Sequence, residues 1–310
     1  MTIRIAGTGS ALPEYVRTNK EIEGFVETTD EWIRERTGIC ERRISQGDTV
    51  VSLAVSAAKK AMEAAGMLPE DLDFILLATC SPEYLLPSAS CQVQGAIGAK
   101  KAVCMDLNAA CSGFLFSLET AYAYIHSGIY KNALIIGSEV LSKLVNWTDR
   151  GTCILFGDGA GAVVVETAEE GFLSMVQGSN GTLGRVLSCD LTTDKFIHMD
   201  GKEVYRFATR QVPMCIEEAV AKAGLRLEEI DYFFLHQANA RILESVSKRL
   251  AIPMEKIPMN LDRVGNTSSA SIPILLDEIA KCGKIQKGQK IVLSGFGAGL
   301  TYSACVIIWG

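Results

Sequence analysis

Three residues of the chain carry side chains suited to nucleophilic catalysis through a sulfur atom. They are Cys111, His236 and Asn266. A cysteine thiolate is a strong nucleophile, and histidine and asparagine can donate hydrogen bonds to an oxygen that becomes negative during a reaction. Each residue also has a structural explanation when taken alone, as a packed thiol, a structural histidine and a helix cap or turn residue.

The expected positions of these residues favour chemistry. Cys111 lies among small residues in Asn108–Gly113, His236 follows an apolar run that ends at Leu235, and Asn266 lies in a Gly-Asn-Thr-Ser turn. We expect each to follow a strand, where ligands bind in α/β sheets. Cys111 would also precede a helix, and a helix N-terminus lowers the pKa of a thiol. We therefore predict a partly ionised Cys111.

An internal repeat relates the two halves of the chain. At the shift of 155 residues, Cys111 and Asn266 take matching places, which favours a joint role over separate structural ones. Three pairs of segments resemble each other at shifts of 155 to 158 residues: 64–77 with 222–235, 105–128 with 259–283, and 133–137 with 290–295.

The repeat predicts an α/β fold of two similar layered halves. Each half reads as three helix–strand units, and the strands are continuous apolar runs, as in a sheet covered on both faces. Leu115–Ile125 and Ile272–Ile279 carry little charge, so we expect them to form a shared middle layer. The prediction is a five-layer α/β/α/β/α sandwich, with residues 1–168 as the N-terminal half and 169–310 as the C-terminal half.

Composition excludes several classes of protein. The chain has 310 residues, 48% of them apolar and 21% charged, which is unlike a disordered chain. Its net charge of −6 argues against a dedicated nucleic-acid binder. No apolar run approaches the roughly 20 residues of a membrane span, and we expect no secretory signal and no membrane association.

The ten cysteines and three histidines show no metal-ligand spacing, and no cysteines form a C-x-x-C pair. We therefore expect free thiols, a cytoplasmic protein and no metal site. The glycine-rich segments 7–12 and 157–161 lack the strand–turn–helix pattern of a dinucleotide loop.

These residues resemble a known family. The chain is similar to β-ketoacyl-acyl carrier protein synthase III, one of the thiolase-fold condensing enzymes, from its first strand to its C-terminus. The segments that carry the resemblance are 29–39, 87–89, 108–113, 149–152, 156–161, 200–204, 236–239, 265–268 and 295–299.

The resemblance implies a two-stage reaction without metal or organic cofactor. Cys111 would take an acyl group from a short acyl-CoA, its substrate, and malonyl-acyl carrier protein would then bind. His236 and Asn266 would stabilise the enolate formed by decarboxylation, which attacks the Cys111 thioester. The backbone N–H groups of Cys111 and Ala298 would hold the tetrahedral oxyanion. The product is a 3-oxoacyl chain on the carrier protein, which initiates fatty acid synthesis.

The resemblance also implies binding sites and a homodimer. CoA and pantetheine would contact Thr28, Trp32, Arg36, Arg150, Gly201, Lys202, Ala238, Asn239 and Phe296. The acyl pocket would be bounded by Leu86, Leu141 and Phe156, with Leu86 reaching across the dimer interface.

The acyl carrier protein is expected to be acidic, so its docking site on this acidic chain must be a local basic patch. Two helical stretches offer cations there, although an ordinary solvated helix face has the same pattern. The candidate docking residues are Arg206, Arg210, Arg241, Lys248 and Arg249, with Lys202 beside them.

Three positions depart from the family pattern: Ala298 replaces a usual glycine, Lys202 a usual uncharged residue, and Val264 a usual aromatic residue or histidine. The nearest alternative function is a secondary-metabolite ketosynthase or acyltransferase with the same three residues. A cysteine hydrolase and a non-catalytic carrier-binding protein also remain open. A thiolase would need a second catalytic cysteine in the loop 295–299, which has none.

Overall fold

The computed structural model describes residues 1–310, and its strands form two large sheets. The first sheet uses only residues before 169. In spatial order, its strands are β1 (Thr2–Ala11), β7 (Gly159–Ala168), β6 (Asn132–Glu139), β4 (Phe74–Ala78) and β5 (Val103–Leu107). β4 runs parallel to both β5 and β6, whereas β7 runs antiparallel to β1 and β6.

The second sheet repeats most of this order with residues after 171. Its strands are, in spatial order, β8 (Phe172–Ser179), β13 (Thr301–Ile308), β12 (Lys290–Gly297) and β11 (Tyr232–Leu235). β11 and β12 are parallel, and the other pairs are antiparallel. The chain passes from one sheet to the other in the turn between β7 and β8. The predicted domain boundary at 168/169 falls in this turn and stays a prediction.

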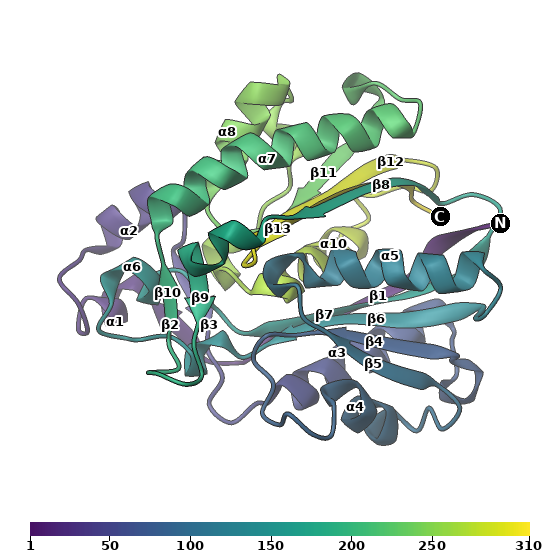
Figure 1. The fold of residues 1–310 in the computed structure, drawn as a ribbon, viewed down its shortest axis with the longest axis horizontal. Helices are drawn as coiled ribbons and strands as arrows, with labels where there is room; N and C mark the ends of the chain where they lie inside the picture. Colours follow the sequence, from purple (N-terminus) through teal and green to yellow (C-terminus); the bar gives the residue numbers. More distant parts are fainter.

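Three layers of helices enclose the two sheets (Figure 1). α5 (Gly113–His126) and α10 (Ser271–Lys281) lie between the sheets. α3 (Val50–Ala65) and α4 (Ala89–Ile97) cover the first sheet from outside, and α7 (Gly201–Lys222) and α8 (Ala240–Leu250) cover the second. The five-layer prediction is confirmed. No helix is both long enough and apolar enough to span a membrane.

Shorter elements gather at the end of the sandwich where the strands carrying the site terminate (Figure 1). The short helices and strands are α1 (Asn19–Ile22), α2 (Asp30–Thr37), α6 (Arg150–Cys153), α9 (Leu261–Val264), β2 (Val16–Thr18), β3 (Glu41–Arg43), β9 (Leu187–Cys189) and β10 (Ile197–Met199). The 3₁₀ turns of the chain are η1 (Pro69–Asp71), η2 (Ala110–Ser112), η3 (Leu141–Lys143), η4 (Gly181–Val186), η5 (Leu227–Glu229), η6 (Met254–Lys256) and η7 (Ser268–Ala270).

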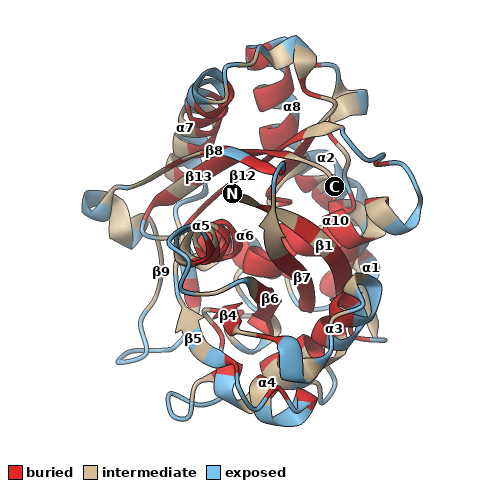
Figure 2. Cartoon of the chain, turned by 90° about the vertical axis from the view of Figure 1, so that its right-hand side faces the viewer, coloured by how far each residue is buried: buried red, intermediate tan, exposed pale blue.

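The middle layer is apolar, as its low charge predicts. Figure 2 shows buried residues along both sheets and on α5 and α10. Phe114 and Leu115 of α5 and Leu275 and Leu276 of α10 belong to one core cluster that includes side chains of both sheets. Burial of this kind contributes about 25 cal/mol per Å² of apolar surface, so the shared core joins the two halves.

The register of the repeat differs from the prediction. β4 and β11 begin 158 residues apart, as do β6 and β12 (232 − 74 and 290 − 132). Ala110 and Ser268, also 158 apart, share a left-handed backbone with φ of 48° and 51°. Cys111 therefore corresponds to Ser269, and the match with Asn266 is wrong. The shift of 155 matched the C-terminal ends of α5 and α10. It is three residues smaller than 158 because α10 has 11 residues and α5 has 14.

The second half also lacks one predicted strand. The chain at Leu261–Val264 forms the short helix α9 where the first half has β5. Two hydrogen bonds hold Asn260, just before α9. Its backbone N–H donates to Gln237 Oε1, and its side-chain amide donates to Glu278. The second sheet consequently has four strands, against five in the first.

We predict that Gly137→Ala destabilises the fold. Gly137 of β6 packs against η7, and an added Cβ would lie 2.7 Å from the carbonyl carbon of Ser269 and closer still to its oxygen. Overpacking of this kind costs about 1–3 kcal/mol. Gly95→Ala in α4 is the control, because an added Cβ there meets nothing within 4 Å. The free energy of unfolding, measured in urea, should fall for Gly137→Ala only, and equal losses would contradict the prediction.

Candidate active site

Cys111, His236 and Asn266 line one cavity of about 500 Å³. Cys111 lies in η2 after β5, His236 directly follows β11, and Asn266 lies between α9 and η7. All three are buried at the end of the sandwich where these strands terminate. The structure therefore brings the three predicted residues together, while their catalytic roles stay predictions.

The backbone around Cys111 is held by the end of the second sheet. The Thr301 hydroxyl bonds to the carbonyl of Ala109 and to the Ser112 hydroxyl, each at 3.1 Å. Gly297 packs so closely that an added Cβ would lie 2.7 Å from the Cys111 nitrogen. A glycine is required there, because any side chain would push the Cys111 N–H away from the end of β12.

The predicted low pKa of Cys111 is wrong in direction. Burial, with a smaller contribution from the nearby Glu139 carboxylate, raises the pKa of the Cys111 thiol to about 12, although hydrogen bonding with the Ser268 side chain lowers it. Desolvation disfavours the charged thiolate, and this effect opposes that of the helix N-terminus. Burial therefore favours the protonated thiol of Cys111 over the thiolate.

His236 is neutral for the same physical reason. Its backbone N–H donates to the Ser294 carbonyl at 2.8 Å, which continues the pairing of β11 with β12. The imidazole meets the ring of Phe296 edge-on, with centroids 5.5 Å apart, and Nδ1 lies 2.7 Å from Ser271 Oγ. Burial lowers the pKa of His236 to about 3.

The Asn266 side chain is oriented by its own turn. Its backbone N–H donates to the Leu155 carbonyl at 2.9 Å, and its carbonyl accepts the Gly157 N–H at 3.0 Å. Oδ1 accepts the Ser268 N–H at 2.9 Å, so the amide nitrogen is the group left to donate to a ligand. His236 and Asn266 together offer neutral donors to an oxygen that develops negative charge.

Glu139 is a site residue that the sequence analysis missed. It ends β6, is fully buried, and its carboxylate contacts both halves of the protein. A carboxylate with several donors is stabilised as an anion, although burial raises the pKa of Glu139. Its donors are the Thr79 hydroxyl, the Cys80 N–H, the Ser81 hydroxyl and, from the second half, the hydroxyls of Ser268 and Ser269.

A second cavity, of about 260 Å³, meets the first at Cys111, Phe156 and Leu187. Its lining includes Leu141 and Ala298. Further apolar residues that the sequence analysis did not single out complete the lining: Leu144, Leu187, Leu191 and Ile197.

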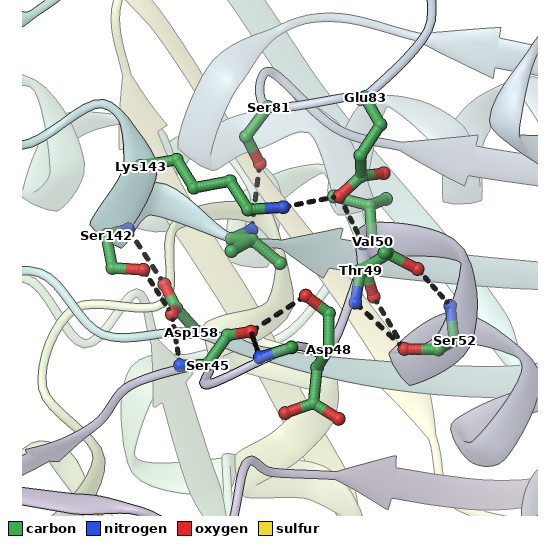
Figure 3. A network of polar contacts seen from close by, with 12 residues as sticks. Ser45, Asp48, Thr49, Val50, Ser52, Ser81, Glu83, Ser142, Lys143 and Asp158 are labelled. Atoms are coloured by element: carbon green, nitrogen blue, oxygen red, sulfur yellow. Dashed lines mark hydrogen bonds and ion pairs between the residues drawn. The ribbon is translucent and has the colours of Figure 1, made fainter.

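Asp158 fixes the wall between Phe156 and Leu141. Its carboxylate accepts the N–H and hydroxyl of Ser142 at 2.9 and 2.6 Å and the N–H of Ser45 at 2.8 Å (Figure 3). Because Ser142 adjoins Leu141, and Asp158 follows Phe156 by two residues, these bonds set the separation of the two apolar side chains.

Most residues predicted to bind CoA line the first cavity. Arg36 and Arg150 place their guanidinium groups 5.6 and 4.9 Å from the ring of Trp32. Arginine is suited to phosphate and aromatic rings to a stacked base. The other predicted residues that line this cavity are Gly201, Ala238, Asn239 and Phe296.

Four groups of predicted residues line neither of these two cavities. The first is Thr28, whose hydroxyl is buried without a hydrogen-bond partner. Lys202 lines a shallow surface depression beside Gly201, and Leu86, 86% exposed, lines neither deep cavity. The five docking candidates are exposed on α7 and α8: Arg206, Arg210, Arg241, Lys248 and Arg249.

Comparison with known proteins identifies the family. Models of 3-oxoacyl-acyl carrier protein synthase III match residues 105–181, and models of its C-terminal region match residues 220–309. The chain is 48% identical to β-ketoacyl-acyl carrier protein synthase III 1 of Bacillus cereus, with 100% of each chain covered. The chain belongs to the β-ketoacyl-acyl carrier protein synthase III family.

Two solved structures extend the comparison. The synthase III of Aquifex aeolicus matches with a TM-score of 0.97 and 44% identity, over 99% of this chain and 100% of that one. The priming β-ketosynthase of the R1128 polyketide pathway matches with a TM-score of 0.96 and 33% identity, over 99% and 96%. The predicted family and thiolase-like fold are confirmed.

One departure from the synthase III pattern is accommodated by the backbone. Ala298, where the family usually has glycine, is not among the non-glycine residues with positive φ. Its Cβ therefore adds no backbone strain, and its N–H is retained. Val264, the other departure near the site, is buried in α9.

We predict that alkylation of Cys111 by iodoacetamide accelerates about tenfold per pH unit from pH 7 to 10, without a plateau. With a pKa of about 12, the thiolate fraction is still increasing throughout this range. The exposed Cys282 of the same chain is the internal control for the reagent. Mass spectrometry of the two peptides measures both rates, and a plateau below pH 8 would show that the helix end outweighs burial.

Proposed function

We propose that the protein catalyses the decarboxylative condensation of a short acyl-CoA with malonyl-acyl carrier protein, and so initiates fatty acid synthesis. The observation that carries the proposal is the position of Cys111 where two cavities meet, with His236 and Asn266 lining the larger one. Membership of the synthase III family supports the same reaction.

The first stage transfers the acyl group to Cys111. The sulfur attacks the thioester carbonyl, the bond to the CoA sulfur breaks, and the thiol proton ends on the released CoA. The N–H groups of Cys111 and Ala298 would stabilise the tetrahedral oxyanion, and the close packing of Gly297 on Cys111 supports this arrangement.

The second stage forms the carbon–carbon bond. The malonyl carboxylate leaves as CO₂, and its bonding electrons form an enolate whose oxygen accepts hydrogen bonds from His236 and Asn266. The enolate carbon then attacks the Cys111 thioester, and the sulfur leaves as a thiolate that takes a proton from water to restore the thiol. This chemistry requires no metal or organic cofactor, because loss of CO₂ drives it and the thioester carbonyl delocalises the charge. No group of three or more His, Cys, Asp or Glu side chains is arranged to hold a metal ion.

The two cavities suit different parts of the substrates. The larger cavity has Trp32, Arg36 and Arg150 together, a set suited to the adenine ring and phosphates of CoA. The pantetheine arm would pass Gly201, and the apolar second cavity would take the acyl chain against Leu141 and Phe156. Further pantetheine contacts are proposed for Ala238, Asn239 and Phe296, with Thr28 and Lys202 at the edge of the CoA site.

We further propose a homodimer through β5. This strand ends the order of the first sheet, and Val103 and Met105 on it are 49% and 37% exposed. An unpaired apolar edge strand is a template for pairing with a second chain. Leu85 and Leu86 are more than four-fifths exposed, and Leu86 would then reach the acyl pocket of the other copy. All ten cysteines are free, which supports a cytoplasmic location.

We predict that acylation and condensation separate in variants of the site. Cys111→Ala should give no acyl adduct with acetyl-CoA, since the nucleophile is gone. His236→Ala should still form the adduct but lose about 10²- to 10³-fold in condensation with malonyl-acyl carrier protein, the usual cost of one oxyanion donor. Intact-protein mass spectrometry and CO₂ release measure the two stages.

Cys282→Ala is the control, because Cys282 is exposed and lines neither cavity, so acylation should stay intact. Acylation at another cysteine, or normal condensation by His236→Ala, would refute the assignment. The same experiment tests the alternatives. An adduct that hydrolyses without condensation indicates a hydrolase. Condensation only with longer or unusual primers indicates a secondary-metabolite ketosynthase, an alternative that the similarity to the R1128 enzyme supports.

We also propose that the basic residues of α7 and α8 bind the carrier protein. Arg249 donates to the Thr209 carbonyl of α7 at 3.3 Å, so the cations of the two helices lie near each other. Arg241 donates to the Glu35 carbonyl, which ties the start of α8 to the end of α2 and so to the CoA site.

Lys248→Glu is therefore expected to raise the KM for malonyl-acyl carrier protein by about threefold to tenfold, because it puts a negative charge in the path of an acidic partner. Added salt should reduce the difference between variant and parent. Lys59→Glu, an exposed charge reversal on α3, is the control. An equal rise in KM for both variants would argue against docking on α8.

A further inference from the structure

We infer that Ser271 is a positioning residue that holds His236 in the tautomer with its proton on Nε2. The inference rests on the proposed role of His236 as a hydrogen-bond donor. Ser271 is the first residue of α10, and its hydroxyl oxygen lies 2.7 Å from Nδ1 of His236. Both residues are buried, with 1% and 2% of their surfaces exposed, so water does not compete for this contact.

The imidazole of His236 has one side-chain hydrogen-bond partner, Ser271. Phe296 lies at the edge of the ring, and burial is the sole influence on the pKa of His236, with no charged group contributing. The opposite nitrogen, Nε2, belongs to a side chain that lines the larger cavity. The contact with Ser271 therefore determines which of the two ring nitrogens carries the proton.

The other hydrogen bonds of the Ser271 hydroxyl determine whether it donates to His236 Nδ1 or accepts from it. Its oxygen accepts a long hydrogen bond from the Gln237 N–H, at 3.4 Å. Its own hydrogen has no acceptor other than His236 Nδ1, and a buried hydroxyl donates when an acceptor is within reach. Ser271 therefore donates to Nδ1, and the single proton of the neutral imidazole is on Nε2.

This tautomer is the one that the proposed condensation needs. A neutral imidazole has one N–H, and with that proton on Nδ1 the ring would direct its donor at the start of α10 and present a lone pair to the enolate oxygen. Repulsion between the lone pair and the oxygen would replace stabilisation. Because His236 is not protonated twice near neutral pH, the choice of tautomer determines whether it can act at all.

Nitrogen-15 NMR of histidine-labelled protein tests the tautomer directly. The chain has only three histidines, and His126 and His198 are exposed, so the signals of His236 can be assigned by their loss in His236→Ala. In the unsubstituted protein at pH 7 we expect Nε2 to have the shift of a protonated nitrogen and Nδ1 that of an unprotonated one. The reverse pattern, or an average of the two, would overturn the inference whether or not Ser271→Ala folds.

Substitution tests the consequence. Ser271→Ala should move the His236 shifts toward a mixture of tautomers and slow condensation about tenfold, the effect of losing one buried hydrogen bond. It should leave the yield of the Cys111 acyl adduct unchanged, and Ser271→Thr should restore the shifts and most of the rate. Ser117→Ala, in the sister helix α5, is the matched control, because its buried hydroxyl has no partner.

The outcomes separate this inference from the proposed function. If the unsubstituted protein forms the adduct but never condenses, the proposed function fails while the NMR result still stands on its own. If the unsubstituted protein condenses and Ser271→Ala changes neither the shifts nor the rate, Ser271 has no positioning role. Equal losses in Ser271→Ala and Ser117→Ala would likewise reduce Ser271 to a packing residue.

Discussion

The carboxylate of Glu139 joins the two halves of the protein at the point where the site is built. It accepts hydrogen bonds from the turn after β4 in the first half and from the hydroxyls of Ser268 and Ser269 in the second. The Ser268 N–H in turn orients the Asn266 side chain. Burying a charged group costs free energy unless hydrogen bonds compensate it, and those hydrogen bonds then hold the group rigidly in place. The position of Asn266 relative to Cys111 therefore depends on Glu139 being fully satisfied.

Burial around this carboxylate also sets the electrostatics of the site. It raises the pKa of Cys111 and lowers the pKa of His236, which favours a thiol and a neutral imidazole in the same cavity. Neutral groups fit a cavity that must receive a malonyl carboxylate and develop an enolate, because a resident ion pair would be stabilised before the substrate arrives. The site thus keeps its donors uncharged until the reaction itself creates charge.

Much of this arrangement could be predicted from the sequence. The repeat predicted the layers, and the expected positions of Cys111, His236 and Asn266 after strands predicted a shared site. Asn266 joins this site although it follows the short helix α9 instead of a strand. The register of the repeat was wrong by three residues because α10 is shorter than α5, a difference that local patterns conceal. Glu139 was missed because a single acidic residue after an apolar run has the pattern of a strand end exposed to solvent. Ser271 was missed because a serine at a helix start is usually a cap.

The junction of the two cavities at Cys111 has a kinetic consequence. If the larger cavity receives the pantetheine arm of CoA and later that of the carrier protein, the two arms exclude each other, while the acyl chain waits in the smaller cavity on the other side of the sulfur. Free CoA then competes with the second substrate for the acylated protein. A cell with a high ratio of free to acylated CoA would slow chain initiation through occupancy of this one passage, without a separate regulatory site.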